Sequence, residues 1–355
     1  MATHSAVRLC RVSGLHRLVG GAWVDDAGDP VDDDAALRRL RALAIPPGWR
    51  EVWASTDADA RVQATGVDAR GRTQYRYSAQ AEAEAARLKF HDLLAFGSAL
   101  PELRSRVASD LGASATDAPG DRVRQATAAV VRLIDRGLFR VGSNRYARDN
   151  HTYGLTTLTT EHVVVEGPVL EFTFVGKEHR PWHVSIDDGA VAGVVSRLIA
   201  ERTDAPAPLF AVDTANGRHD VTSVVVNAYI HAATAAPASA KTFRTWGGTA
   251  AAATTVAGAT AGRGESSARA RRIDLAAFDA AAALLGNTRD VARRSYVHPM
   301  ALRAGASEAV TTAVRRAIAE TGSDDVRSLL ASDDVVRALS AELERLASEP
   351  VGVLG

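Results

Sequence analysis

Segments far apart in the sequence carry side chains that together could act on a phosphodiester. Arginine guanidinium groups grip the non-bridging phosphate oxygens in a fork geometry and stabilise transition-state charge. A lysine ammonium can protonate a leaving alkoxide, and a tyrosine phenol can attack phosphorus to form a covalent ester. Taken singly, each of these residues is better explained as a surface charge or a buried aromatic. Together with one asparagine, they predict phosphoryl transfer: Arg140, Lys177, Lys241, Arg244, Asn287 and Tyr296.

A three-stranded antiparallel meander is expected to position Lys177. Runs of strand composition are separated by turn residues, and Lys177 lies in the second turn with a strand on either side. The predicted strands cover residues 162–166, 170–175 and 181–186.

Helices are expected to position the other candidates. An apolar face at helical spacing predicts a helix over residues 123–139, which Arg140 closes. Lys241 and Arg244 are three residues apart at a helix start and are expected to share a face. Asn287 follows a glycine at a helix end. The other predicted helices cover residues 81–96, 101–111, 190–202, 221–233, 244–257, 275–285, 307–321 and 333–346, and loops are predicted over 112–121 and 260–272.

Residues 1–80 are predicted to form a small β-rich domain. Short apolar runs, broken by Gly and Asp turns, predict strands, and a short helix is expected over residues 35–43. An aspartate cluster at residues 25–34 fits a solvated hairpin tip and a helix N-cap better than a metal site. The predicted strands cover residues 15–19, 22–24, 52–54, 62–65 and 75–77.

Composition describes an ordinary globular chain of 355 residues, with 46% hydrophobic and 24% charged residues. The length favours two domains, predicted as residues 1–80 and 81–355 in an α+β fold, the second one mainly helical. The formal net charge is zero. It is uneven along the chain, however, because residues 61–90, 121–180 and 241–300 carry net charges of +3, +2 and +5. These basic segments hold the residues proposed for chemistry and predict salt-sensitive binding to a polyanion.

Lysine is scarce in this chain, which has 39 arginines but only Lys89, Lys177 and Lys241. A GC-rich genome explains the scarcity. Because arginine replaces lysine as a surface charge but not as a proton donor, the remaining lysines are better than average candidates for chemistry.

Targeting and cofactor signals are not found in the sequence. Cys10 is the only cysteine, and no apolar run reaches the length of a signal peptide or a membrane span. A cytoplasmic protein without a membrane partner is therefore expected. No zinc spacing, P-loop or dinucleotide fingerprint predicts a metal or another cofactor.

Five separated blocks, in order, resemble the type IB DNA topoisomerases, most of all the small bacterial and poxvirus-type forms. The N-terminal block reads IPPGWREVWAS and, further on, QATGVDARGRTQYRY, within residues 45–77. The others are RVGSNRYARDNHTYGLTTLTTEHV from residue 140, EFTFVGKEHRPWHV from residue 171, KTFRTWGGT from residue 241 and GNTRDVARRSYVHP from residue 286. The resemblance extends over roughly residues 8 to 300.

The resemblance implies a role for each candidate. Tyr296 would be the nucleophile that forms a 3′-phosphotyrosyl link and releases a 5′-hydroxyl strand. Arg140 and Arg244 would clamp the scissile phosphate. Lys177 would be the general acid that protonates the 5′ oxygen, assisted by Lys241.

One position departs from the viral members, which have a histidine where this chain has Asn287. An amide can donate the same hydrogen bond to a phosphate oxygen but cannot carry a charge. His298, two residues after the tyrosine, could compensate, although a packing role is favoured. Lys89 matches no catalytic position.

The resemblance also implies residues that contact double-stranded DNA. Tyr75 and Tyr77 alternate along a strand and therefore share a face, and nearby arginines, Arg76 among them, favour DNA contact over packing in the sheet. The implied DNA-binding set is Gln74, Tyr75, Tyr77, Tyr146, Arg70 and Arg72.

The function implied is a monomeric topoisomerase that closes around duplex DNA and relaxes supercoils of either sign without ATP or metal. A tyrosine recombinase is the first alternative, although recombinases typically have His-x-x-Arg where this chain has Lys241-x-x-Arg244, and they lack the N-terminal block. A non-catalytic DNA-binding protein is the alternative from another class.

Overall fold

The protein has two compact units, which are described here from a computed structural model. The described residues are 13–113, 119–202, 206–214, 217–259 and 267–349. The units divide between residues 89 and 90, inside the helix α2 (Ala79–Gly112). The N-terminal unit contains an antiparallel sheet and the second unit is mainly helical, which confirms the predicted α+β class. No helix in the described part of the chain is long and apolar enough to span a membrane.

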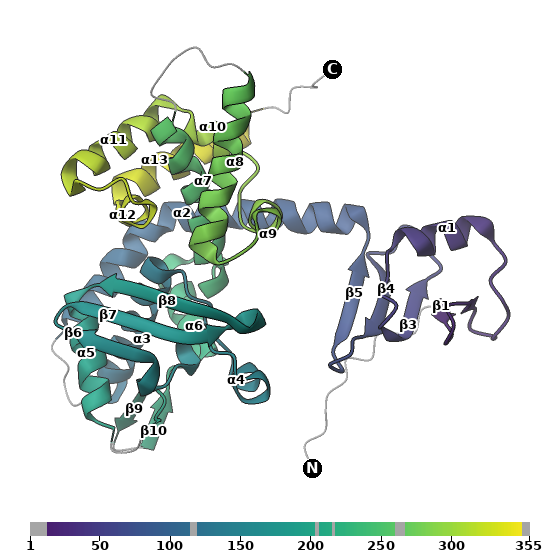
Figure 1. The fold of residues 1–355 in the computed structure, drawn as a ribbon, viewed down its shortest axis with the longest axis horizontal. Helices are drawn as coiled ribbons and strands as arrows, with labels where there is room; N and C mark the ends of the chain where they lie inside the picture. Colours follow the sequence, from purple (N-terminus) through teal and green to yellow (C-terminus); the bar gives the residue numbers. More distant parts are fainter. Residues whose placement is uncertain (1–12, 114–118, 203–205, 215–216, 260–266, 350–355) are drawn as a thin grey trace. The chain divides into compact units, whose positions relative to one another are not determined.

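The N-terminal unit is a five-stranded antiparallel sheet with one helix, α1 (Asp34–Ala42), against it (Figure 1). Leu40 of α1 packs with Leu15, Ala54 and Ala64 of the sheet to form a small core. The strand order is β2-β1-β3-β4-β5. The strands are β1 (Gly14–Arg17), β2 (Trp23–Val24), β3 (Arg50–Ser55), β4 (Val62–Val67) and β5 (Thr73–Tyr77).

The aspartate cluster has the structural role that its sequence predicts. The Asp33 side chain accepts from the backbone N–H groups of Ala35 and Ala36 and so caps α1. One oxygen of Asp25 accepts from the N–H groups of Ala27 and Asp29 at 2.8 and 3.0 Å. These bonds stabilise the turn that leads into the helix.

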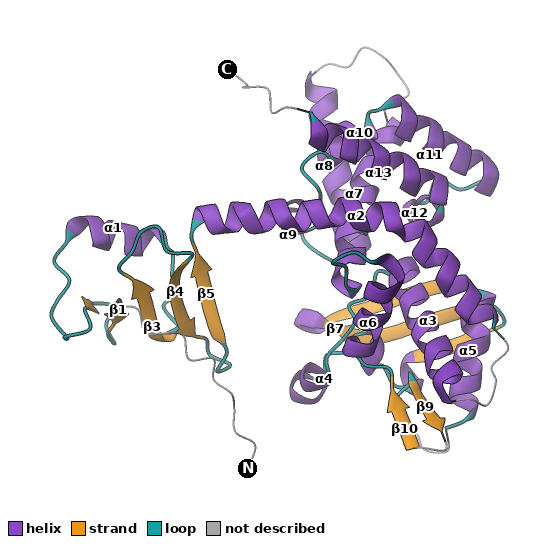
Figure 2. Ribbon diagram, turned by 180° about the vertical axis from the view of Figure 1, so that it is seen from behind, coloured by secondary structure: helices purple, strands orange, loops and turns teal. Residues whose placement is uncertain are grey.

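The second unit contains the predicted meander, with strand order β6-β7-β8. The strands are β6 (Val163–Glu166), β7 (Val169–Gly176) and β8 (Arg180–Asp187). Along β7 the buried and more accessible residues alternate, and the buried ones include Phe172 and Phe174. Helices α3 (Pro119–Gly137) and α5 (Gly189–Ala200) cover the buried face, as Figures 1 and 2 show from opposite sides.

The helix α7 (Ala240–Ala259) runs through the middle of the helical part of this unit. It packs against α8, α10, α11 and α12. Small residues allow close approaches between α7 and these helices. For example, a Cβ on Gly305 of α10 would lie 2.3 Å from the carbonyl oxygen of Ala253 in α7. The remaining helices are α4 (Asn144–Asn150), α6 (Ser223–Thr234), α8 (Ser267–Leu285), α9 (Arg289–Ser295), α10 (Ala301–Gly305), α11 (Glu308–Thr321), α12 (Val326–Ala331) and α13 (Asp333–Ser348).

The predicted helices and loops differ from the structure in several places, and the helices α4, α9, α10 and α12 were not predicted. The two helices predicted over 81–96 and 101–111 are one helix, α2, which continues through Pro101 and is bent along its length (Figure 2). The predicted loop over 260–272 is helical from residue 267, where α8 begins, and its first seven residues lie outside the described part. The predictions also missed the hairpin of β9 (Ala211–Thr214) and β10 (Gly217–Asp220), whose strands are only four residues long.

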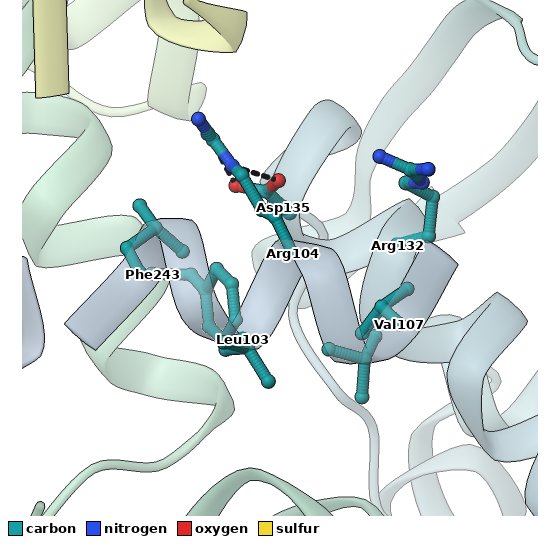
Figure 3. A pocket seen from close by; sticks show the side chains of 8 residues that line it. Leu103, Arg104, Val107, Arg132, Asp135 and Phe243 are labelled. Carbon is teal, nitrogen blue, oxygen red and sulfur yellow. Dashed lines mark hydrogen bonds and ion pairs between the residues drawn. The ribbon is translucent and has the colours of Figure 1, made fainter. Parts of the chain in front are cut away.

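Arg104 of α2 is the centre of a buried ion-pair network, and Figure 3 shows its contact with Asp135. Its Nε and Nη2 atoms donate to the two carboxylate oxygens of Asp135 in α3 at 2.8 and 2.9 Å. Its Nη1 donates to Asp333, the first residue of α13, at 2.8 Å, and Nη2 also donates to the Leu330 carbonyl oxygen. Although burial opposes the charged form, the two carboxylates raise the pKa of Arg104 above its usual value.

Replacing Arg104 by methionine is expected to destabilise the helical unit by about 3–5 kcal/mol, because it leaves the Asp135 carboxylate buried without its partner. Urea unfolding followed by circular dichroism would measure this loss. Arg316→Met is a matched control, since Arg316 forms its ion pair with Asp334 on the surface, with side chains 61% and 50% exposed, and the change should alter the midpoint little. Equal midpoints for the two variants would contradict a stabilising role for the Arg104 network.

Candidate active site

Arg244 is the buried centre of the candidate site. Its side chain lies on α7 and is only 2% exposed. One guanidinium nitrogen donates to the Leu138 carbonyl oxygen and the other terminal nitrogen to the Leu285 carbonyl oxygen at 2.7 Å. Burial, and then the neighbouring charge of Arg140, lower the pKa of Arg244 to about 10. The group therefore remains charged at neutral pH.

Arg140 and Asn287 approach each other from two turns. Arg140 does not close α3 as predicted, because the helix ends at Gly137 and Leu138 has a left-handed backbone with φ 52°. Asn287 follows Gly286, whose φ of 61° is the usual conformation after a helix end. The Arg140 Nη2 atom donates to the Asn287 Oδ1 atom at 3.3 Å. Because a guanidinium has only donors, this contact turns the Asn287 amide nitrogen away from Arg140.

Two buried donors in this cluster have no hydrogen-bond partner among the described residues. They are the Nε atom of Arg244 and the Nδ2 atom of Asn287. A buried donor without a partner costs free energy and needs an explanation. An anion bound between the arginines would accept from both donors and would favour the charged form of Arg244. The cluster can therefore bind a tetrahedral anion such as a phosphate.

Tyr296 lies beside this position at the C-terminal end of α9. The Arg244 guanidinium carbon is 5.5 Å from the centre of the Tyr296 ring. A Cβ on Gly248 of α7 would lie 2.9 Å from the Tyr296 carbonyl oxygen, so glycine is needed for the tyrosine backbone to approach this closely. The geometry places a phenol next to the anion position.

Thr249 fixes the backbone on both sides of Val297, directly after the tyrosine. Its hydroxyl donates to the Tyr296 carbonyl oxygen at 3.2 Å and accepts from the His298 N–H at 3.0 Å. His298 is buried, and its ring meets the Phe90 ring edge to face at a centroid distance of 4.9 Å. This agrees with the packing role that was favoured for His298. Sequence reasoning did not single out Thr249.

Lys177 lies in the turn of the β7–β8 hairpin, as predicted. The side chain is exposed. The next two residues, Glu178 and His179, both have left-handed backbones, with φ 65° and 56°. Consecutive left-handed residues match the twist of a tight hairpin. A fixed turn thus presents a flexible ammonium group.

Lys241 is not brought into the cluster. It lies in the first turn of α7 and is exposed, whereas Arg244 is buried. A separation of three residues corresponds to about 300° around a helix. Lys241 and Arg244 can therefore lie near each other on α7 while one side chain is exposed and the other is buried. The Lys241 side chain makes no hydrogen bond or ion pair within the described part of the chain.

Three of the residues predicted to contact DNA, Gln74, Tyr75 and Tyr77, lie on the edge strand β5. The rings of Tyr75 and Tyr77 stack at a centroid distance of 6.0 Å and are 40% and 44% exposed. They share a face, as predicted. Arg76 lies on the other face, where it covers the Trp49 ring and donates to the Ala44 carbonyl oxygen. Although Arg76 lies between the tyrosines in the sequence, its side chain does not lie beside their rings.

Asp68 restrains two other members of the predicted DNA-binding set. It accepts from the Arg72 Nε at 2.8 Å and from the Gln74 Nε2 at 3.0 Å, and the bonds from Arg72 lower the pKa of Asp68 to about 2. Arg70 is exposed. The Tyr146 side chain lies outside the described part.

Metal ligation has no support among the described residues, where no group of three His, Cys, Asp or Glu side chains could hold an ion.

The α+β fold with a tyrosine beside an arginine-lined anion position defines the class that type IB topoisomerases and tyrosine recombinases share. The family model for the catalytic core of eukaryotic DNA topoisomerase I matches residues 78–320. The model for the N-terminal domain of bacterial DNA topoisomerase IB matches residues 21–68. The chain belongs to the type IB DNA topoisomerase family.

A viral relative gives a third comparison. The DNA topoisomerase 1B of Acanthamoeba polyphaga mimivirus is 27% identical over 214 residues. The match covers 59% of this chain and 62% of the viral protein.

Proposed function

We propose that this protein is a type IB DNA topoisomerase that relaxes positive and negative supercoils without ATP or metal. Family membership supports the class of reaction. The single observation that carries the chemistry is the pair of buried, unpartnered donors on Arg244 and Asn287. A scissile phosphate would satisfy both and would lie beside the Tyr296 phenol.

The proposed reaction exchanges one phosphodiester for another. The Tyr296 hydroxyl loses its proton to water as its oxygen attacks phosphorus on duplex DNA, the bond to the 5′ oxygen breaks, and Lys177 gives a proton to that oxygen. Arg140, Arg244 and Asn287 hold the non-bridging oxygens while negative charge develops. Lys241 has a weaker claim to assist, since it is exposed and outside the cluster.

The 3′-phosphotyrosyl ester keeps the energy of the broken bond. The free 5′ end can therefore rotate around the intact strand and attack back, which restores the tyrosine. This exchange needs no ATP.

One chain supplies all the proposed groups, so a monomer is the expected active form, and the nucleoid is its expected location.

Relaxation of a supercoiled plasmid, without ATP and with EDTA, tests the proposal. We expect positive and negative supercoils to relax, and relaxation to weaken at high salt because phosphate contacts dominate affinity. Recombined or joined plasmids would instead indicate a tyrosine recombinase. DNA binding without relaxation at any salt concentration would indicate a non-catalytic DNA-binding protein.

The stacked pair of Tyr75 and Tyr77 is proposed to contribute to DNA affinity. Replacing both by alanine is expected to weaken binding about 30-fold or more, since an aromatic contact with a base contributes about 1–3 kcal/mol and about 1.4 kcal/mol corresponds to tenfold in Kd. Fluorescence anisotropy with a labelled duplex would measure this. Leu88→Ala removes exposed apolar surface from α2 and serves as the control. Unchanged affinity in the double variant would exclude this face from the DNA interface.

A further inference from the structure

The Trp182 side chain in β8 lies against both arginines of the site. Its ring is 5.9 Å from the guanidinium carbon of Arg140 and 5.9 Å from that of Arg244. These distances are within the range of cation–π attraction. One indole therefore contacts two cations that come from different parts of the chain.

The same ring also meets the two turns that carry the other polar groups. A Cβ on Gly176, directly before Lys177, would lie 2.7 Å from a Trp182 ring atom. A Cβ on Gly286, directly before Asn287, would lie 3.1 Å from the ring. Both turns are thus packed on the indole, and glycine is what allows the contact.

The electrostatics of the free site explain why an aromatic ring is useful here. Arg140 and Arg244 repel each other when no anion lies between them, which is one reason why the pKa of Arg244 is lowered. The negative face of an indole attracts cations, and tryptophan is the aromatic side chain that attracts them most strongly. Trp182 therefore offsets part of the repulsion and keeps both groups in place before DNA binds.

Neighbouring groups hold the indole itself in position. Phe174 stacks on Trp182 with a centroid distance of 6.1 Å and an angle of 12° between the rings. Phe139 lies 6.4 Å away. Arg180, two residues before Trp182, donates to the Gly286 carbonyl oxygen at 3.1 Å and so ties the hairpin to the Asn287 turn.

We propose that Trp182 is a positioning residue that sets the spacing of Arg140, Arg244 and the Lys177 hairpin around one phosphate. This inference rests on the proposed function. It adds a residue that touches the groups bound to the phosphate rather than the phosphate itself. The sequence block around Lys177 contains Trp182, but no local pattern indicates that the ring meets four separate segments.

Single-turnover cleavage of a suicide duplex, with a short strand beyond the cleavage site, tests the proposal. For Trp182→Leu we expect cleavage to slow about 10- to 100-fold, because two cation–π contacts are lost, while the Kd for DNA changes less than threefold. Trp182→Phe keeps an aromatic face and should restore the rate to within about threefold of the wild type. Phe172→Leu removes another ring of the same sheet and should lower the unfolding midpoint without slowing cleavage.

The outcomes separate this inference from the proposed function. A wild-type protein that does not cleave the duplex would overturn both. A cleaving wild type with an equally fast Trp182→Leu variant would overturn only the role of Trp182. A loss of rate that Phe172→Leu reproduces would also overturn it, because the effect would then follow from weaker packing of the sheet.

Discussion

Tyr296→Phe is expected to abolish plasmid relaxation while DNA binding remains. The change removes one oxygen, and with it the proposed attacking group, so the rate should fall by about 10⁴-fold or more, as for other lost nucleophiles. The phenylalanine ring keeps the contact with Arg244, and Thr249 and Gly248 act on the backbone of residue 296 rather than its ring. Relaxation assays would measure strand passage, trapping with detergent would measure the covalent adduct, and fluorescence anisotropy would measure DNA binding.

Tyr229→Phe is the matched control for loss of a tyrosine hydroxyl. The Tyr229 hydroxyl donates to Asp110 at 2.7 Å in another part of the helical unit, and burial and this carboxylate raise the pKa of Tyr229 above its usual value. This variant should lose some stability and keep relaxation. A covalent adduct formed by Tyr296→Phe would mean that another residue is the nucleophile.

Local patterns predicted the two sheets well. Alternation along β7 and the turn residues after it are local signals, and they were enough to predict the meander that carries Lys177. In the N-terminal unit, the aspartates before α1 predicted a helix start because capping uses side chains and backbone groups within three residues. The fold class followed from these elements.

Elements that depend on distant contacts were not predicted. Gly97 and Pro101 suggest a break between two helices, yet α2 continues. At Gly97 an added Cβ would lie 2.3 Å from the Trp246 ring of α7, so this glycine provides room for a neighbouring helix. The β9–β10 strands are only four residues long, too short for alternation to show.

The candidate site was predicted as a list of residues, and the structure adds how they are held. The order of the motifs indicated Arg140, Arg244, Asn287 and Tyr296, which the structure brings together. Sequence reasoning missed Thr249 and Trp182, because their contacts join segments more than 40 residues apart. The glycines beside the motif residues are the one signal in the sequence that could have indicated such close packing.

Lys177→Ala is expected to slow cleavage of ordinary DNA by about 10²- to 10⁴-fold, the usual contribution of a general acid. Without a proton donor the 5′ oxygen would have to leave as an alkoxide. A duplex with sulfur in place of that bridging oxygen has a much better leaving group, because thiols have a pKa near 8.5. On this substrate the variant should cleave at nearly the wild-type rate, measured as covalent adduct in a single turnover.

Lys177→Arg separates proton donation from positive charge. Arginine keeps the charge in the hairpin but does not give up a proton near neutral pH, so this variant should be as slow as Lys177→Ala on ordinary DNA and should recover on the sulfur substrate. Full activity of Lys177→Arg would mean that the hairpin supplies only charge. Arg244→Lys provides the opposite pattern, since loss of the phosphate-binding fork slows both substrates. Slow cleavage of ordinary DNA by both Lys177 variants, with recovery on the sulfur substrate that Arg244→Lys does not show, would identify Lys177 as the proton donor.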